Sequence, residues 1–103
     1  MASRRSPLVT KKFDALGMLL AERTSTHGGL AIQGGISQRL KQEARDAPNW
    51  TALGMDMREA IDMIQHKIAR ILAGDPTYVD HWDDIAGYAR LVADRLRKGA
   101  SNE

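Results

Sequence analysis

Acidic side chains are concentrated where the last long helical pattern of this chain begins. Asp80, Asp83 and Asp84 fall close together, and Asp80 and Asp84 are one helical turn apart, so their carboxylates project from the same side of a helix. Like charges at this spacing repel each other, and we therefore expect a neutralising group nearby. Two such carboxylates also suit Mg²⁺, which takes oxygen ligands and binds partly through water or substrate phosphate.

Two cations on the preceding helical pattern are candidates for that neutralising group. Counting outward from the turn between the two helices, we expect Lys67 opposite Asp84, and Arg70 opposite the stretch from Asp80 to Asp83. Such pairs can simply fix the register of two helices. The same cations could instead hold phosphate oxygens, Arg70 through its guanidinium fork and Lys67 as a point charge. The residues alone leave both interpretations open.

Four more residues border this region. Glu59 and Asp62, on the same helical pattern as the cations, could add metal ligands or could belong to a solvated face. Tyr88 continues the row of aspartates and could pack at the edge of the core or bind a ligand by stacking or hydrogen bonding. Gly87 costs about 1 kcal/mol relative to alanine inside a helix, and close approach of a neighbouring helix or ligand would explain it.

Other site chemistries are disfavoured by the residue types present. The chain contains no cysteine, which excludes thiolate zinc sites and thiol nucleophiles and fits a reducing compartment. Its three histidines, His27, His66 and His81, lack a metal-ligand spacing such as His-x-x-x-His, so we predict no zinc site. His81 is expected to be exposed near the start of its helix.

Length and composition predict one globular, cytoplasmic domain. The chain has 103 residues, of which 43% are hydrophobic and 27% charged, and no apolar run is long enough to cross a bilayer. The start, MASRRSPLVTKK, is basic but lacks the apolar core of a secretory signal. Because this segment holds four of the fifteen basic residues, the net charge of +2 becomes −2 without it. Nucleic-acid binding and membrane association are not expected.

The periodicity of apolar residues predicts an all-α protein with four helices. We expect a helix over 13–23, a second over 30–45, a third that begins after a cap at Asn49 or Thr51 and ends near residue 72 or 73, and a fourth over 79–97. The last two should form an antiparallel hairpin. The predicted organisation is a basic, flexible arm over 1–12, a single all-α domain over 13–98 and a frayed tail over 99–103.

Three segments together resemble a family of small bacteriophage and prophage proteins. The segments are LLAERTSTHGG, MREAIDMIQHKIARILAGDP and DHWDDIAGYARLV, and they share with that family Lys-x-x-Arg, a short turn containing glycine, and Asp-x-x-x-Asp-Ile-x-Gly-Tyr. The resemblance covers about residues 16–96. Those proteins are in turn similar to the all-α nucleoside triphosphate pyrophosphohydrolases, the MazG-like and dimeric dUTPase-like group.

The resemblance implies a function in nucleotide metabolism, with Mg²⁺ as the cofactor. Enzymes of that group pair two acidic helices, bind Mg²⁺ with their carboxylates and cleave a nucleotide between its α and β phosphates. In this chain Arg58 stands where the enzymes carry an acid. The resemblance implies metal ligands at Glu59, Asp62, Asp80 and Asp84, with catalytic roles for Glu59, Asp80 and Asp84, and substrate binding by Lys67, Arg70, Tyr88, Arg23 and His27.

Several alternatives accompany this interpretation. Arg23 and His27 could reach a phosphate or the fourth helix, or could simply be a basic pair at a helix C-terminus. The resemblance also implies a homo-oligomer, acting in the cytoplasm of a bacterial host if the chain is encoded by a phage. Three functions follow as hypotheses: a Mg²⁺-dependent (d)NTP pyrophosphohydrolase, a non-catalytic protein that sequesters nucleotides or inhibits a host defence protein, and a structural helical oligomer.

Overall fold

The protein is all-α over the residues that its structure describes. The computed structural model describes residues 7–101, with side chains from Asp14 to Ala100, and no strand occurs in this part of the chain. The elements are α1 (Pro7–His27), α2 (Leu30–Arg45), a 3₁₀ turn η1 (Trp50–Ala52), α3 (Met55–Ala73) and α4 (Val79–Ser101). The predicted all-α class is therefore confirmed.

The helix bounds agree with the sequence prediction in some places and differ in others. The bounds of α2 are those predicted, and α3 ends at Ala73 before Gly74, as expected. α3 starts later than predicted, at Met55, because residues 50–52 form a separate 3₁₀ turn. α4 continues beyond residue 97 to Ser101. Of the predicted arm and tail, residues 1–6 and 102–103 lie outside the described part of the chain, while 7–12 belong to α1.

α1 continues through the segment where we expected it to stop. Side-chain hydroxyls there do not cap or end the helix but donate hydrogen bonds back to its own carbonyl oxygens. Thr24 bonds to the carbonyl of Leu20 at 2.9 Å, and Ser25 bonds to that of Glu22 at 2.8 Å. The helix therefore reaches His27, and the chain turns only at the two glycines that follow.

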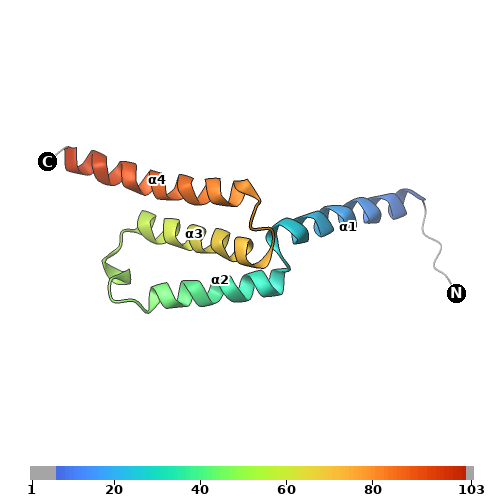
Figure 1. Cartoon of the computed structure of the whole chain (residues 1–103), viewed down its shortest axis with the longest axis horizontal. Coiled ribbons are helices and arrows are strands. Elements are labelled where there is room, and N and C mark those ends of the chain that lie inside the picture. Colours follow the sequence, from blue (N-terminus) through green and yellow to red (C-terminus); the bar gives the residue numbers. More distant parts are fainter. Residues whose placement is uncertain (1–6, 102–103) are drawn as a thin grey trace.

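Three of the four α-helices within residues 7–101 form a single layer. α3 lies in the middle, with α2 on one side and α4 on the other, each running antiparallel to it (Figure 1). α1 leaves this layer at the end where α2 begins, and it projects away from it (Figure 1). Its contacts with the layer are chiefly with α3, near the junction.

The core of this layer is thin. Among the described side chains only three apolar residues are buried, Ala60, Ala69 and Ile71, and all three lie on α3. Helices that lie side by side bury only the seams between them, so each face of the layer stays open to solvent. Consequently many large apolar side chains on α1, α2 and α4 remain exposed.

Two glycines fix how α1 joins the layer. Gly28 has a φ of +83°, a conformation that favours glycine, and a Cβ there would lie 2.5 Å from the Cβ of Ala73. A Cβ on Gly74 would lie 2.4 Å from the carbonyl oxygen of Thr26. The amide of Asp75 donates a hydrogen bond of 3.1 Å to that same oxygen. The end of α1 is thus packed directly on the end of α3, which sets the direction of α1.

Candidate functional site

The predicted pairing of Lys67 with Asp84 is present. Lys67 Nζ lies 2.9 Å from Asp84 Oδ2, and the lysine side chain is only 13% exposed, whereas that of Asp84 is 46% exposed. This hydrogen bond and the lysine charge lower the pKa of Asp84. The aspartate that we expected to be neutralised is therefore neutralised from α3.

Arg70 does not occupy the position that we predicted. We expected it opposite Asp80 to Asp83, but within residues 7–101 it forms no ion pair with either. Its Nε is buried and has no hydrogen-bond partner in the described structure. Asp80 instead accepts a hydrogen bond from the side chain of Tyr78, whose pKa it raises. The reason is the helical rotation between Lys67 and Arg70, which points Arg70 toward α1 and α2.

The four carboxylates predicted to hold Mg²⁺ are not gathered at one place. No group of three or more histidine, aspartate or glutamate side chains suited to a metal occurs in the described part of the chain. Glu59 is exposed beside Asp56, and Asp84 is paired with a lysine. Asp62 differs from these, because its Oδ1 is buried and no partner for it is described.

Tyr88 and Gly87 lie on the open side of α4. Tyr88 is half-buried and borders two shallow depressions, one with Asp83 and Asp84 and the other with Glu59. A Cβ added to Gly87 would meet nothing within 4 Å. The close neighbour that we expected at this glycine is therefore not part of the described chain.

A pocket at the junction of α1, α2 and α3 brings together three of the five predicted substrate-binding residues. We call it the junction pocket; its volume is about 300 Å³. Its lining residues are Leu20, Arg23, Thr24, His27, Gly28, Leu30, Gln33, His66 and Arg70. The lining thus contains two arginines and two histidines and no carboxylate. α2 begins at its edge after Gly29, without a side-chain cap on its free amides.

His27, one of the lining residues, contacts His81. His81 Nε2 lies 3.1 Å from the carbonyl oxygen of Thr26 and 3.1 Å from His27 Nδ1. A carbonyl oxygen only accepts, so His81 Nε2 carries a proton, and this single proton is shared between two acceptors, the Thr26 carbonyl and His27 Nδ1. Neutral His27 therefore carries its own proton on Nε2. His81 is 1% exposed, which corrects the expectation that it would be exposed.

The two histidines of the junction pocket have lowered pKa values. Burial lowers the pKa of His27, and the charges of Arg70, His81, Arg23 and Lys67 lower it further. Burial likewise lowers the pKa of His66, with added effects of Arg70, Lys41 and Lys67. Both histidines are hard to protonate, first because they are partly buried and second because positive charge collects beside them without a compensating acid in the pocket lining. A bound anion would supply that compensation.

His66 and Gln33 are members of the junction pocket that the sequence analysis did not single out. Gln33 is 7% exposed, and its Nε2 lies 3.5 Å from His66 Nε2. His66 and Arg70 are four residues apart and so lie on one face of α3. This spacing could have identified His66 as a neighbour of Arg70 from the sequence. Gln33 gave no such signal, because only the packing of α2 against α3 brings it to the pocket.

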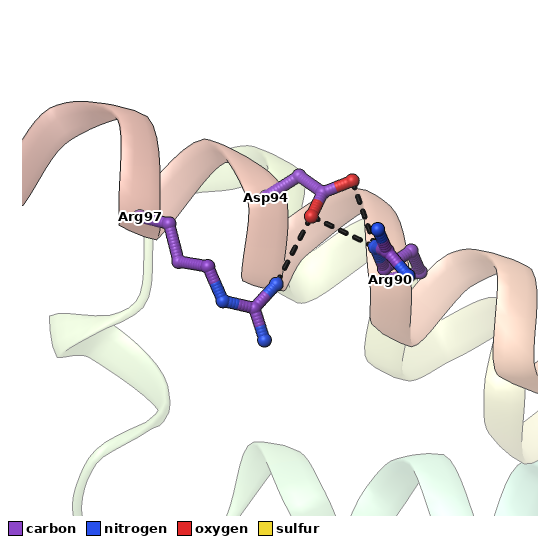
Figure 2. Close-up of polar contacts among 3 residues, drawn as sticks. All are labelled: Arg90, Asp94 and Arg97. Atoms are coloured by element: carbon purple, nitrogen blue, oxygen red, sulfur yellow. Dashed lines mark hydrogen bonds and ion pairs between the residues drawn. The ribbon is translucent and has the colours of Figure 1, made fainter.

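Charged residues elsewhere on α4 satisfy one another on the surface. Figure 2 shows Asp94 between Arg90 and Arg97, with Arg90 Nε 2.8 Å and Arg97 Nη1 3.0 Å from its Oδ1. All three side chains are more than half exposed, so these pairs contribute little to stability. Arg90 can therefore serve as an exposed control position for the arginines of the junction pocket.

The fold and the pocket together define an all-α protein with a cationic site between helix ends. Comparison of the chain with models of protein families, with curated proteins and with solved structures found no match. None of the helices within residues 7–101 is sufficiently long and apolar to span a membrane.

Proposed function

We propose that this protein binds a nucleotide and holds its phosphates in the junction pocket. The observation that carries the proposal is the lining of this pocket, which combines Arg23, His27, His66 and Arg70 with no carboxylate. Phosphate oxygens accept hydrogen bonds from guanidinium groups in a bidentate manner, and the free amides at the start of a helix favour an anion. Arg70 Nε, buried without a described partner, is a donor that such an oxygen would satisfy.

The size and rim of the pocket support a ligand larger than inorganic phosphate. Its volume of about 300 Å³ is at the small end of ligand pockets, enough for phosphates but not for a whole nucleotide. Leu20 and Leu30 line it beside the cations, and they are 53% and 82% exposed. These leucines offer apolar surface for a sugar or base that extends from the phosphates. The resemblance to MazG-like proteins supports a nucleotide, a four-helix bundle with a helical hairpin, and a cytoplasmic homo-oligomer.

A second candidate function is Mg²⁺-dependent pyrophosphohydrolysis. The specific observation in its favour is Asp62 Oδ1, a buried carboxylate oxygen without a described partner that a cation would satisfy. Glu59, Asp80 and Asp84, the other predicted ligands, are not grouped with Asp62 in the described structure, so the helices would have to rearrange before they could share a metal with it. Mg²⁺ bound there would neutralise charge on the phosphates. Asp84 is paired with Lys67, so it would have to exchange that partner for the metal.

Calorimetric titration with a panel of (d)NTPs tests the proposal. We expect binding by the unmodified chain, and an affinity about tenfold or more lower for Arg70→Met, because a charge-assisted hydrogen bond is lost. Arg90→Met is the matched control: its side chain is 73% exposed on α4, so affinity should not change. Absence of nucleotide binding by the unmodified chain would contradict the proposal. The structural helical oligomer would then be the remaining hypothesis.

The same titration separates the two candidate functions. Binding without turnover should persist when Mg²⁺ is removed by a chelator. Hydrolysis requires pyrophosphate release that depends on Mg²⁺ and disappears in Asp62→Asn. Binding that persists in chelator, together with no pyrophosphate release at high protein concentration, supports sequestration.

A further inference from the structure

α1 carries a row of leucines that nothing in the described chain covers. Leu16, Leu19 and Leu20 lie within about 100° around the helix, and each is more than half exposed. Every described side chain from Asp14 to Ser25 is exposed. A helix without tertiary packing is marginal in water, because its amphipathic face must be buried to stabilise it. Some apolar surface must therefore cover this row.

That surface does not come from the described part of the same chain. The packing of Gly28 on Ala73, and of Gly74 on the carbonyl of Thr26, fixes α1 where it points away from the layer. Folding α1 back over the layer would have to break this packing and the hydrogen bonds of the Thr26 carbonyl with Asp75 and His81. The covering surface therefore belongs to another molecule.

The three-helix layer has a groove of the right chemistry for such a helix. It lies between α3 and α4 and is lined entirely by apolar residues, namely Leu53, Met57, Ala60, Ile61, Ile64, Ala89 and Val92. Its volume is about 300 Å³. α1 and α3 have 21 and 19 residues, which correspond to about 31 Å and about 28 Å, so α1 can span the length of the layer.

The size of the open surface points to a second copy of this chain. The accessible surface is 7886 Å², whereas a compact monomer of this mass exposes about 5,800 Å². The excess is larger than the roughly 800 Å² per partner that a stable interface buries. The radius of gyration is 19.5 Å, against about 13 Å for a compact chain of this length. One molecule carries both the leucine row and the apolar groove, so two copies can satisfy each other reciprocally.

We infer that α1 of one copy lies in the groove between α3 and α4 of a second copy, and that the exchange is reciprocal. Each three-helix layer then gains a fourth helix, and the four-helix bundle is completed by two chains. The leucine row ends at the rim of the junction pocket, which Leu20 also lines, so the partner lies next to this rim. The inference does not depend on nucleotide binding.

Molar mass in solution is the first test. Light scattering of the full chain should give at least twice the monomer mass of 11.4 kDa. The double variant Leu16→Glu and Leu19→Glu should give the monomer mass, because charge enters the covered row. The double variant Met18→Glu and Ser25→Glu is the matched control, since both residues lie on the opposite face of α1 and are exposed, and its mass should stay that of the unmodified chain. A monomeric unmodified chain, or an oligomer that resists the leucine substitutions, overturns the inference.

Disulfide cross-linking tests the contact itself and does not depend on whether the glutamate variants fold. The chain has no cysteine, so two single variants, Leu19→Cys and Ile61→Cys, can be mixed and oxidised. A disulfide-linked product that contains one chain of each variant supports the exchange. Met18→Cys mixed with Ile61→Cys is the control and should give no such product. Cross-linking of Leu19→Cys only to itself would place α1 against α1, and it would overturn the inference, as would no cross-linking.

Discussion

Two cations three residues apart on α3 have different surroundings. Lys67 turns toward α4 and pairs with Asp84, whereas Arg70 turns toward α1 and α2 and lines the junction pocket. Three residues advance a helix by about 300°, which separates the two side chains by about 60° around its axis. Because α3 lies between its neighbours, this angle places one cation in an ion pair and the other in the junction pocket.

The two pocket histidines make stability depend on pH in a defined direction. The pKa values of His27 and His66 are lowered in the folded protein below the usual histidine value of 6.5. The unfolded chain therefore binds more protons just below this pH, so stability is retained above it and decreases as the pH falls through it. We expect the melting temperature to drop between about pH 7.5 and about pH 5.5.

Circular dichroism melts at both pH values measure this effect. The double variant His27→Gln and His66→Gln should lose most of the pH dependence, because carboxylates titrate at lower pH. Triphosphate added at the lower pH should restore part of the melting temperature of the unmodified chain, since an anion favours the protonated pocket. A pH dependence that is the same in the unmodified chain and the double variant would contradict the assignment of these two histidines.

The ion pair between Lys67 and Asp84 predicts an asymmetric response to substitution. Asp84→Asn leaves a lysine that is only 13% exposed without its charged partner, whereas Lys67→Met leaves an aspartate that is 46% exposed and can be solvated. The urea midpoint should therefore fall more for Asp84→Asn than for Lys67→Met. Equal urea midpoints for the two variants would contradict this prediction. They would indicate that only the aliphatic part of the Lys67 side chain is buried and that its ammonium group is solvated.

Individual elements of this chain depend on contacts at their ends. Arg58, at the start of α3, donates hydrogen bonds to the carbonyls of Trp50 and Thr51, at 3.2 Å and 3.0 Å, and so holds η1 against the helix. Arg58 therefore has a structural role at the start of α3.

Glycine substitutions distinguish the junction from the rest of the helices. Gly28→Ala should lower the free energy of unfolding by about 2 kcal/mol or more, because alanine is strained at positive φ and its Cβ would overlap Ala73. Gly34→Ala, inside α2, is the matched control: a Cβ there meets nothing within 4 Å, and stability should rise by about 0.5–1 kcal/mol. Urea unfolding at fixed protein concentration measures both. Similar losses for the two variants would mean that the junction has no special role.

At the scale of the whole molecule, the folded state is expected to depend on protein concentration. Only Ala60, Ala69 and Ile71 are buried apolar residues in the described chain, too few to stabilise a domain of this size without a partner. The melting temperature should therefore rise over about a hundredfold increase in concentration, because association favours the folded state. The variant Leu16→Glu with Leu19→Glu should melt at a lower temperature without this dependence. A concentration-independent midpoint in the unmodified chain would show that the layer is stable alone.

Local chemistry determined much of this protein from its sequence. Apolar periodicity predicted the fold class and the bounds of α2, glycine after Ala73 predicted the end of α3, and helical spacing predicted the Lys67–Asp84 pair. These features depend on residues within one helix, or on two helices joined by a short turn, so spacing along the chain is enough to place them.

Only the tertiary structure decided where α1 points and which residues meet at its end. The junction pocket joins side chains from three helices, among them Arg23, Gln33 and Arg70, and their meeting depends on the packing of Gly28 and Gly74. Helical periodicity shows which face of a helix is apolar, but it contains no information on what covers that face. Long-range packing determines what covers each face. Here it brings cations together at one end of the layer and leaves the leucines of α1 exposed.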